Sequence, residues 1–183
     1  NRADAPDDLI PQFDFIRQSV LAFNLPSIEL LNYEADDLIA TYVDQILKLG
    51  AKVTIVSSDK DLMQLFKKDV RIYDPMKNKF ITNEDVKTKF GVTPDKVVDV
   101  QSLAGDSSDN VPGVPGIGVK TAAELINKYK TLENLLDKAQ EIKQNKRRET
   151  ILENKDKALI SKKLVTLKKD VPVKDNLEDF ILK

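Results

Sequence analysis

Residues 106–122 read DSSDNVPGVPGIGVKTA, two aspartates followed directly by a turn rich in glycine and proline. The carboxylates of Asp106 and Asp109 are ligands that hard divalent cations prefer. Glycines allow positive φ and a close approach of the backbone to a ligand, and the helix N-terminus that follows presents N–H groups to a phosphate. A metal site next to a phosphate site indicates an enzyme that cuts nucleic acid.

Two further acidic clusters precede this stretch. Glu34, Asp36 and Asp37 open a segment with helical spacing, and Asp59 and Asp61 follow a short β-branched apolar run. Because sites in parallel α/β sheets form at the carboxyl ends of strands, we expect all three clusters to meet at one rim of the fold. Converging carboxylates repel one another, and divalent cations remove that repulsion. Two Mg²⁺ or Mn²⁺ ions about 4 Å apart can activate water and stabilise the leaving oxygen of a phosphodiester.

Each acidic cluster also has a purely structural interpretation. The acids at 34–37 favour a helix N-terminus through capping and the helix dipole. Asp59 and Asp61 fit a turn, while Asp106 and Asp109 fit Asx turns at a helix end. The occurrence of three such clusters, each at a predicted strand end or helix start, favours the metal interpretation.

The composition narrows the chemistry. The chain has 183 residues, 41% of them hydrophobic, with no cysteine and no histidine. Disulfides, thiolate nucleophiles, imidazole bases and Ser-His-Asp triads are therefore excluded, and catalysis has to use carboxylates, lysines, hydroxyls or an oxygen-coordinated metal. No apolar run is long enough to span a bilayer and no signal peptide is visible, so we expect a cytoplasmic protein with no membrane partner.

Charge is distributed unevenly along the chain. Residues 1–110 contain 19 acids and 13 bases, whereas residues 111–183 contain 11 acids and 16 bases. An acidic half followed by a basic half fits a metal site beside a phosphate-binding surface, and it equally fits ordinary solvated surface charge. The basic groups at 146–148, 162–163 and 168–169 fit either a phosphate track or a solvated helix face.

The periodicity of apolar residues predicts alternating helices and strands. The first helix is expected to bury a stripe of five residues: Leu9, Phe13, Ile16, Val20 and Leu21. We expect helices over 9–21, 34–49, 62–66, 83–90 and 94–103, and strands over 27–31, 53–56, 70–73 and 80–81. This alternation predicts an α/β fold with a mostly parallel sheet flanked by helices, followed by a largely helical region beyond residue 118. We divide the chain into an α/β core at 1–104, a helical region at 105–170 and a linker at 171–183.

The glycine-rich turn has a mechanical interpretation. It lacks the spacing of a Walker A loop, and no strand precedes it as a dinucleotide-binding fingerprint requires. A helix–turn–helix that grips one DNA backbone strand without reading bases fits better, with a plain interhelical turn as the alternative. The candidate DNA-binding residues are Gly113, Gly116, Gly118, Lys120 and Thr121.

Four motifs in this order resemble the 5′-nuclease (5′→3′ exonuclease, flap endonuclease) domain of bacterial DNA polymerase I. They are YEADD at 33–37, SDKD at 58–61, GDSSDN at 105–110 and VPGVPGIG at 111–118. The resemblance covers nearly the whole chain. It implies a Rossmann-like (PIN-like) α/β domain followed by a helix–three-turn–helix DNA-binding element, a turn that often holds K⁺.

The resemblance also implies roles for the acidic residues. Glu34 and Asp36 would help to hold a first metal ion, with Asp37 close by as a ligand or as a neighbour of the ligands. Four aspartates would surround a second ion: Asp59, Asp61, Asp106 and Asp109. The implied reaction is the hydrolysis of a DNA phosphodiester near a 5′ end or flap, in replication and repair, by a domain joined to a polymerase domain of the same parent chain.

One departure from the family pattern concerns the start of the chain. Asn1 and Arg2 resemble the far end of the family's helical arch, so we expect a part of a larger nuclease domain. The first strand, two acidic ligands and most arch cations are then missing, and the first-metal site is expected to be incomplete. Two other functions stay open: a non-catalytic fragment that binds duplex DNA, and a PIN-like ribonuclease.

Overall fold

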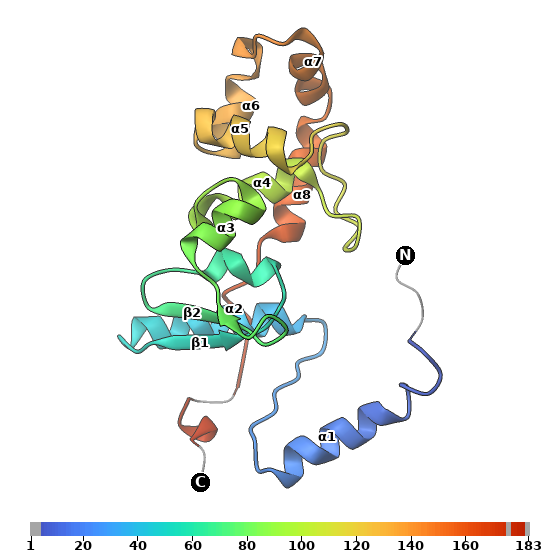
Figure 1. The fold of residues 1–183 in the computed structure, drawn as a ribbon, viewed down its shortest axis with the longest axis vertical. Coiled ribbons are helices and arrows are strands. Elements are labelled where there is room, and N and C mark those ends of the chain that lie inside the picture. Colours follow the sequence, from blue (N-terminus) through green and yellow to red (C-terminus); the bar gives the residue numbers. More distant parts are fainter. Residues whose placement is uncertain (1–4, 175–176, 182–183) are drawn as a thin grey trace.

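The computed structural model describes residues 5–174 and 177–181 (Figure 1). Positions 1–4, together with positions 175–176 and 182–183 of the expected linker, lie outside the described residues. The longer elements are α1 (Gln12–Ala22), α2 (Ala35–Lys48), β1 (Val53–Val56), β2 (Val70–Asp74), β3 (Lys79–Phe80), α3 (Asn83–Phe90), α4 (Val97–Ala104), α5 (Val119–Tyr129), α6 (Leu132–Asp137), α7 (Asn145–Glu153) and α8 (Lys155–Val165). Short 3₁₀ turns are η1 (Asp61–Leu65), η2 (Pro94–Lys96), η3 (Ala139–Glu141) and η4 (Leu177–Phe180). Within the described ranges, no helix has both the length and the apolar character needed to cross a bilayer.

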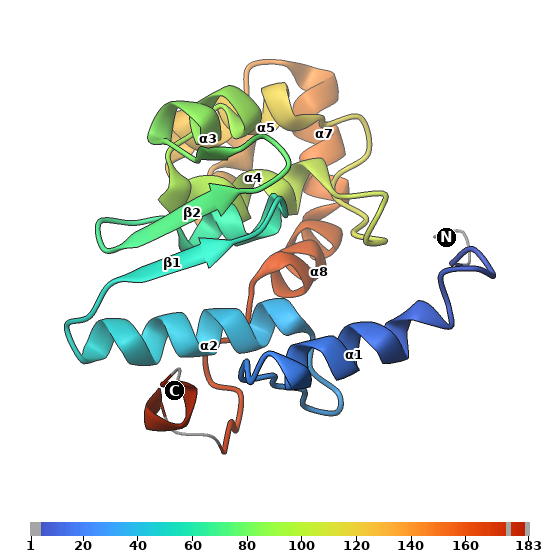
Figure 2. The same cartoon turned by 60° about the horizontal axis from the view of Figure 1, so that its bottom comes forward.

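The sheet is small and mixed. Its strand order is β1-β2-β3, with β1 parallel to β2 and β2 antiparallel to β3. Val53 pairs with Val70 and Ile55 with Ile72, so the β-branched side chains that predicted these strands lie side by side. Figure 2 shows α2 on one side of the two longer strands and α3 and α4 on the other. The α/β architecture is therefore confirmed, with one parallel and one antiparallel pair among the described strands.

The prediction of a strand at 27–31 is wrong. This segment is an irregular connection between α1 and α2 and forms no ladder with a described strand. A β-strand needs the backbone of a neighbour to complete its hydrogen bonds, and none of the described strands pairs with this segment. Leu31, the last residue of the predicted strand, is largely exposed.

The prediction that the first helix buries a stripe of apolar residues is also wrong. Phe13, Ile16 and Leu21 are between 43% and 69% exposed, and Leu9 and Val20 are half-buried. The helix itself forms, but α1 stands apart from the sheet and from the other helices (Figures 1 and 2). Periodicity predicts a helix, whereas burial of its apolar face depends on a neighbour that the described residues do not provide.

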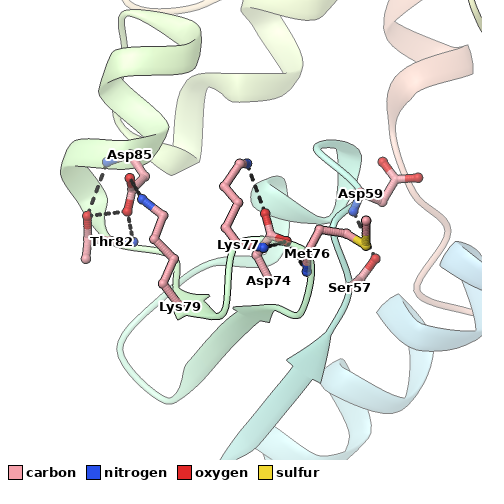
Figure 3. A network of polar contacts seen from close by, with 8 residues as sticks. All are labelled: Ser57, Asp59, Asp74, Met76, Lys77, Lys79, Thr82 and Asp85. Atoms are coloured by element: carbon pink, nitrogen blue, oxygen red, sulfur yellow. Dashed lines mark hydrogen bonds and ion pairs between the residues drawn. The ribbon is translucent and has the colours of Figure 1, made fainter.

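Local hydrogen bonds fix the connection from β2 to α3, as Figure 3 shows. The buried carboxylate of Asp74 accepts the backbone N–H groups of Met76 (3.0 Å) and Lys77 (3.2 Å), which closes the turn into β3. Thr82 and Asp85 form a capping box, in which each side chain accepts the backbone N–H of the other. This capping box explains why α3 begins where the sequence predicts it.

The second half of the chain forms a helical layer around α4. Helices α5 and α8 both pack against α4, and α6 packs against α5. The fully buried side chains span both halves of the chain and include Leu62, Ile72, Leu103, Ile126, Leu132, Leu135 and Ile151. Because these side chains belong to one continuous core, the sheet and the helical layer hold a fixed relation to each other.

The segment after α8 returns to the first half of the chain and is tied there. Gln64 donates to the carbonyl of Val165 (2.9 Å) and accepts the N–H of Leu167 (3.2 Å). The buried hydroxyl of Thr41 in α2 accepts the N–H of Val171 (3.2 Å). Val171, the first residue of the predicted linker, is therefore buried and hydrogen-bonded. These contacts tie the end of α8 and the segment after it to η1 and to the middle of α2.

Candidate metal centre and nucleic-acid interface

The three acidic clusters meet at one pocket of about 540 Å³. Its acidic lining consists of Glu34, Asp36, Asp59, Asp61, Asp106 and Asp109. The opposite wall comes from Val111 and from the end of α8 with its following segment, where Leu164, Val165 and Leu167 contribute apolar surface. The spatial meeting of six of the seven predicted acids is thus present in the fold, while their roles as metal ligands stay predictions.

The turn at the carboxyl end of β1 positions Asp59 and Asp61. The N–H of Asp59 donates to the hydroxyl of Ser57 (3.0 Å), a contact visible in Figure 3. The carboxylate of Asp59 in turn accepts the N–H of Asp61 (2.9 Å). The turn interpretation and the site interpretation therefore both apply here, because the same hydrogen bonds that close the turn direct the second carboxylate toward the pocket.

A short crossing of the chain positions Asp106. Its backbone forms an antiparallel bridge with Val111, with hydrogen bonds of 3.0 and 2.8 Å. Gly105 and Gly113 both have positive φ, and a Cβ added to Gly113 would lie 2.4 Å from the backbone nitrogen of Gly105. The N–H of Gly113 also donates to the buried hydroxyl of Ser161 in α8 (2.9 Å). Gly113 is thus required by packing, which locks the acidic loop against α4 and α8.

Three of the pocket acids lie close enough to share an ion. Carboxylate oxygens of Asp61, Asp106 and Asp109 all lie within 4.8 Å of one another. An oxygen-only donor set of this kind fits Mg²⁺ or Mn²⁺, which take a few carboxylates and complete their shell with water or phosphate oxygens. The residues present therefore suit a hard divalent cation.

The electrostatics of the pocket show an excess of negative charge. Partial burial, followed by repulsion from Asp59 and Asp61, raises the pKa of Asp36 to about 6. Burial also raises the pKa of Asp61, against the lowering effect of a hydrogen bond from Gln101. Both shifts mean that the ionised carboxylates lack enough positive partners.

Asp106 is the exception among these acids. Burial acts to raise its pKa, but hydrogen bonds from Lys60 and Ser108 outweigh burial, and the pKa is lowered. The same contact raises the pKa of Lys60, whose ammonium forms an ion pair with Asp106. One acid of the cluster is therefore matched by a cation from the turn after β1.

The carboxylate of Asp37 has a hydrogen-bond partner outside the pocket lining. This carboxylate accepts the backbone N–H of Lys168 (2.8 Å), and Asp37 is not part of the pocket lining. Its neighbour Asp36 lines the pocket, as expected for adjacent residues on a helix, which point about 100° apart. The predicted metal role of Asp37 stays a prediction, and the structure gives this side chain a tie to the segment after α8.

Gln101 is a site residue that the sequence does not reveal. It is buried in α4 and lines the pocket, and its side-chain N–H donates to the carboxylate of Asp61 (2.6 Å). Its amide oxygen is buried and has no hydrogen-bond partner among the described residues. A neutral residue within a helix carries no sequence signal for such a role, because the contact depends on how α4 packs against the turn after β1.

The predicted DNA-binding residues fall into two groups. Gly113 is buried in the crossing described above, whereas Gly116, Gly118 and Lys120 are exposed around the N-terminus of α5 and Thr121 is half-buried. Gly116 has φ of 73°, and neither it nor Gly118 has an atom near the position of an added Cβ. The open backbone there leaves space for a ligand, and the DNA-binding roles stay predictions.

Four of the basic residues considered for a phosphate track have partners among the described residues: Arg147 with Glu124, Lys168 with Asp170, and Lys162 and Arg148 with partners that join separate elements or turns. Lys162 lies 2.7 Å from Asp99 and 2.7 Å from Glu133, and so joins α8 to α4 and α6. Arg148 donates to the carbonyl of Ile142 (3.0 Å) and to the side chain of Asn145 (2.9 Å). These contacts favour an architectural role for Lys162 and Arg148.

Family models match the whole chain. A model described as 5′-3′ exonuclease, N-terminal resolvase-like domain, matches residues 1–91, and one described as 5′-3′ exonuclease, C-terminal SAM fold, matches residues 92–183. The chain belongs to the 5′-3′ exonuclease family. The resemblance drawn from the motifs is therefore confirmed, as is an α/β domain followed by a helical one. The division at residue 104 stays a prediction.

Curated relatives are DNA polymerases I and separate exonucleases. DNA polymerase I of Rhizobium leguminosarum is 56% identical over 182 residues, which cover 100% of this chain and 18% of that protein. A 5′-3′ exonuclease of Buchnera aphidicola is 36% identical over 189 residues, covering 100% of this chain and 66% of that protein. The chain thus spans about a fifth of the polymerase relatives and about two thirds of the exonuclease.

The fold also matches solved structures. The structure of T5 5′-exonuclease with divalent metal ions (zinc) bound has a TM-score of 0.80 and 21% identity, and the match covers 90% of this chain and 62% of that one. At this identity the likeness shows a shared fold.

Proposed function

We propose that this chain is the metal-dependent 5′→3′ exonuclease and structure-specific flap endonuclease domain of a DNA polymerase I. It hydrolyses DNA phosphodiesters at 5′ ends or flaps in replication and repair, in the cytoplasm, with a polymerase domain of the same parent chain as partner. One observation carries this proposal: acids from three separate segments line one pocket, and three of them come within 4.8 Å.

The proposed cofactors are two Mg²⁺ or Mn²⁺ ions. Asp61, Asp106 and Asp109 would hold one of them, and Glu34 and Asp36 would contribute to the other. Ions bound there supply the positive charge that activates water and stabilises the leaving oxygen of the phosphodiester. The chain's own part is to fix the ligands, and the hydrogen bond from Gln101 sets the orientation of the Asp61 carboxylate.

The turn before α5 is proposed to hold the DNA backbone. Exposed backbone N–H groups at the start of a helix, together with the helix dipole, attract phosphate without reading base sequence. The exposed positions Gly116, Gly118 and Lys120 support this assignment, and Thr121 and the buried Gly113 complete the turn. We also propose K⁺ as an ion of this turn.

A cleavage assay tests the proposal. The full chain is incubated with a 5′-flap DNA and Mg²⁺, and again with EDTA, next to Asp109→Asn and the matched control Asp137→Asn at an exposed site on α6. We expect cutting that needs Mg²⁺, that Asp109→Asn abolishes and that the control retains. DNA binding by every variant without any cutting would instead support a duplex-binding module, and faster cutting of an RNA flap would support a ribonuclease.

A further inference from the structure

Lys60 connects two parts of the acidic pocket. It stands between Asp59 and Asp61 in the turn after β1, and its ammonium crosses to the loop at 105–110 to pair with Oδ2 of Asp106. The Lys60 side chain is 31% exposed and that of Asp106 only 10%. The ion pair is therefore formed at a largely buried carboxylate, and the lysine is the more exposed of the two partners.

Both carboxylate oxygens of Asp106 are engaged. Oδ2 holds the ammonium of Lys60, and Oδ1 accepts the backbone N–H (3.0 Å) and the hydroxyl of Ser108. Asp106 also belongs to the group of three acids that can share an ion. A cation that reaches this carboxylate has to compete with Lys60, because the other oxygen is held by a loop hydrogen bond that the fold needs.

We propose that Lys60 is the resident counter-ion of the metal-free site and that an incoming divalent cation displaces it from Asp106. This inference rests on the proposed function, since it assumes that the cluster binds metal. A divalent ion carries more charge than the ammonium and can contact all three carboxylates at once. It therefore binds the Asp106 carboxylate more strongly than Lys60 does. In the absence of metal, Lys60 limits the repulsion among the acids.

A pocket beside the acidic one can receive the displaced Lys60 side chain. A second pocket of about 440 Å³ adjoins the acidic one, and its lining includes Ser57, Ser58, Lys60 and Lys89. Lys60 already borders this pocket, so rotation of its side chain moves the ammonium there without any change in the backbone. Metal binding thus leaves a free cation beside the metal, on a polar surface.

Metal affinity provides the test. Isothermal titration with Mn²⁺, without DNA, compares the full chain with Lys60→Met, Lys60→Arg and Lys89→Met. Because Lys60→Met removes the competitor, we expect it to bind Mn²⁺ about tenfold more tightly, the change expected for loss of one charge-assisted hydrogen bond. Lys60→Arg keeps the competitor and is expected to bind no more tightly than wild type. Lys89→Met removes a nearby charge without touching Asp106 and is expected to stay within about twofold.

The outcomes separate this inference from the proposed function. Equal or weaker Mn²⁺ affinity in Lys60→Met, with binding by wild type intact, overturns the counter-ion role alone. A tenfold gain in Lys89→Met as well overturns it too, because the effect would then be general. No Mn²⁺ binding by wild type overturns the proposed function as well.

A second measurement follows the Lys60 ammonium group in the wild-type protein itself. Nitrogen-15 NMR of lysine ammonium groups resolves those that are held in ion pairs, and Lys60→Met assigns the signal. We expect the Lys60 signal to lose its ion-pair shift when Mg²⁺ is added, while the signal of Lys162, which pairs with Asp99 and Glu133 and does not line the pocket, stays unchanged. A Lys60 signal that persists unchanged at saturating Mg²⁺ contradicts the displacement.

Discussion

Two clusters of charge join distant segments of this chain, and they do so in opposite ways. At the junction of α4, α6 and α8, Lys162 pairs with Asp99 and Glu133. At the acidic pocket, Lys60 pairs with Asp106 while other carboxylates crowd around it. Lys162 pairs with both of its acidic neighbours, whereas the pocket in which Lys60 pairs with Asp106 is lined by five further acids.

The pKa values express this difference. Burial acts to lower the pKa of Lys162, but Asp99 and Glu133 outweigh burial and the pKa is raised, which means that the pairing stabilises the fold. In the pocket, burial and neighbouring acids raise the pKa of Asp36 and burial raises that of Asp61, which means that their ionised forms oppose folding. A balanced cluster serves the architecture, and an unbalanced one marks a place where an external cation is expected.

The largest expected effect concerns the unbalanced cluster. Replacing Asp61 by asparagine removes one of the three carboxylates that can share an ion, so we expect cleavage of flap DNA to fall by about 100-fold or more, as for the loss of a group that stabilises a transition state. Rates measured at saturating Mg²⁺ test this. If Asp61→Asn retained more than half of the wild-type rate, Asp61 would not be a metal ligand needed for cleavage.

A change in the balanced cluster around Lys162 is expected to lower the stability of the fold without changing metal binding. Lys162→Met leaves Asp99, which is only 7% exposed, without its cation, and breaking such a buried pair costs about 3 kcal/mol. We expect a fall of about 6–12 °C in the melting temperature. The shift caused by Mn²⁺ is expected to match that of wild type. Adding Asp99→Asn, which removes the unpaired charge, is the control and should restore part of the loss; an unchanged melting temperature in Lys162→Met would show the pair to be incidental.

An intermediate effect is expected where a neutral residue supports the pocket. Gln101→Leu keeps the size of the side chain but removes the hydrogen bond to Asp61, and loss of such support lowers metal affinity by about tenfold. Mn²⁺ titration measures it, with Gln140→Leu at an exposed position as the control. Equal affinities in the two variants would contradict the role of Gln101.

The smallest effect depends on pH. The pKa of Asp36 is about 6 in the folded chain and 3.8 as its ordinary value, so its contribution to stability is present at low pH and is lost as the pH rises through 6. Asp36→Asn removes this penalty, and we expect the metal-free melting temperature to rise by about 2 °C at pH 7.5. The gain is expected to shrink toward pH 4.5. A rise in melting temperature that does not depend on pH, or a fall at pH 7.5, would show that the ionised Asp36 carboxylate does not destabilise the folded chain.

The sequence predicts those features that depend on neighbours along the chain. β-branched runs predict β1 and β2, and the periodicity of apolar residues predicts α3. Of the three acidic clusters, only Asp59 and Asp61 follow a described strand, as the strand-end rule assumes; the acids at 34–37 open α2, and Asp106 and Asp109 follow α4. These features need only local patterns and the general geometry of α/β folds.

The remaining features depend on packing between distant segments. The exposure of α1 follows from the absence of a described neighbour, which no periodicity can report. Asp37 bonds to the N–H of Lys168, 131 positions away, and Gln101 reaches Asp61 across 40 positions. Such partners are set by how the helices cross, so the sequence alone does not reveal the hydrogen bond between Asp37 and Lys168 or the one between Gln101 and Asp61.

A crystal soaked in Mn²⁺ tests the central claim most directly, namely that acids from separate segments share cations in one pocket. We predict anomalous density between the carboxylates of Asp61, Asp106 and Asp109, with the Lys60 ammonium moved out of contact with Asp106. Anomalous density absent from this pocket at saturating Mn²⁺, or found only at isolated surface acids, would contradict the claim.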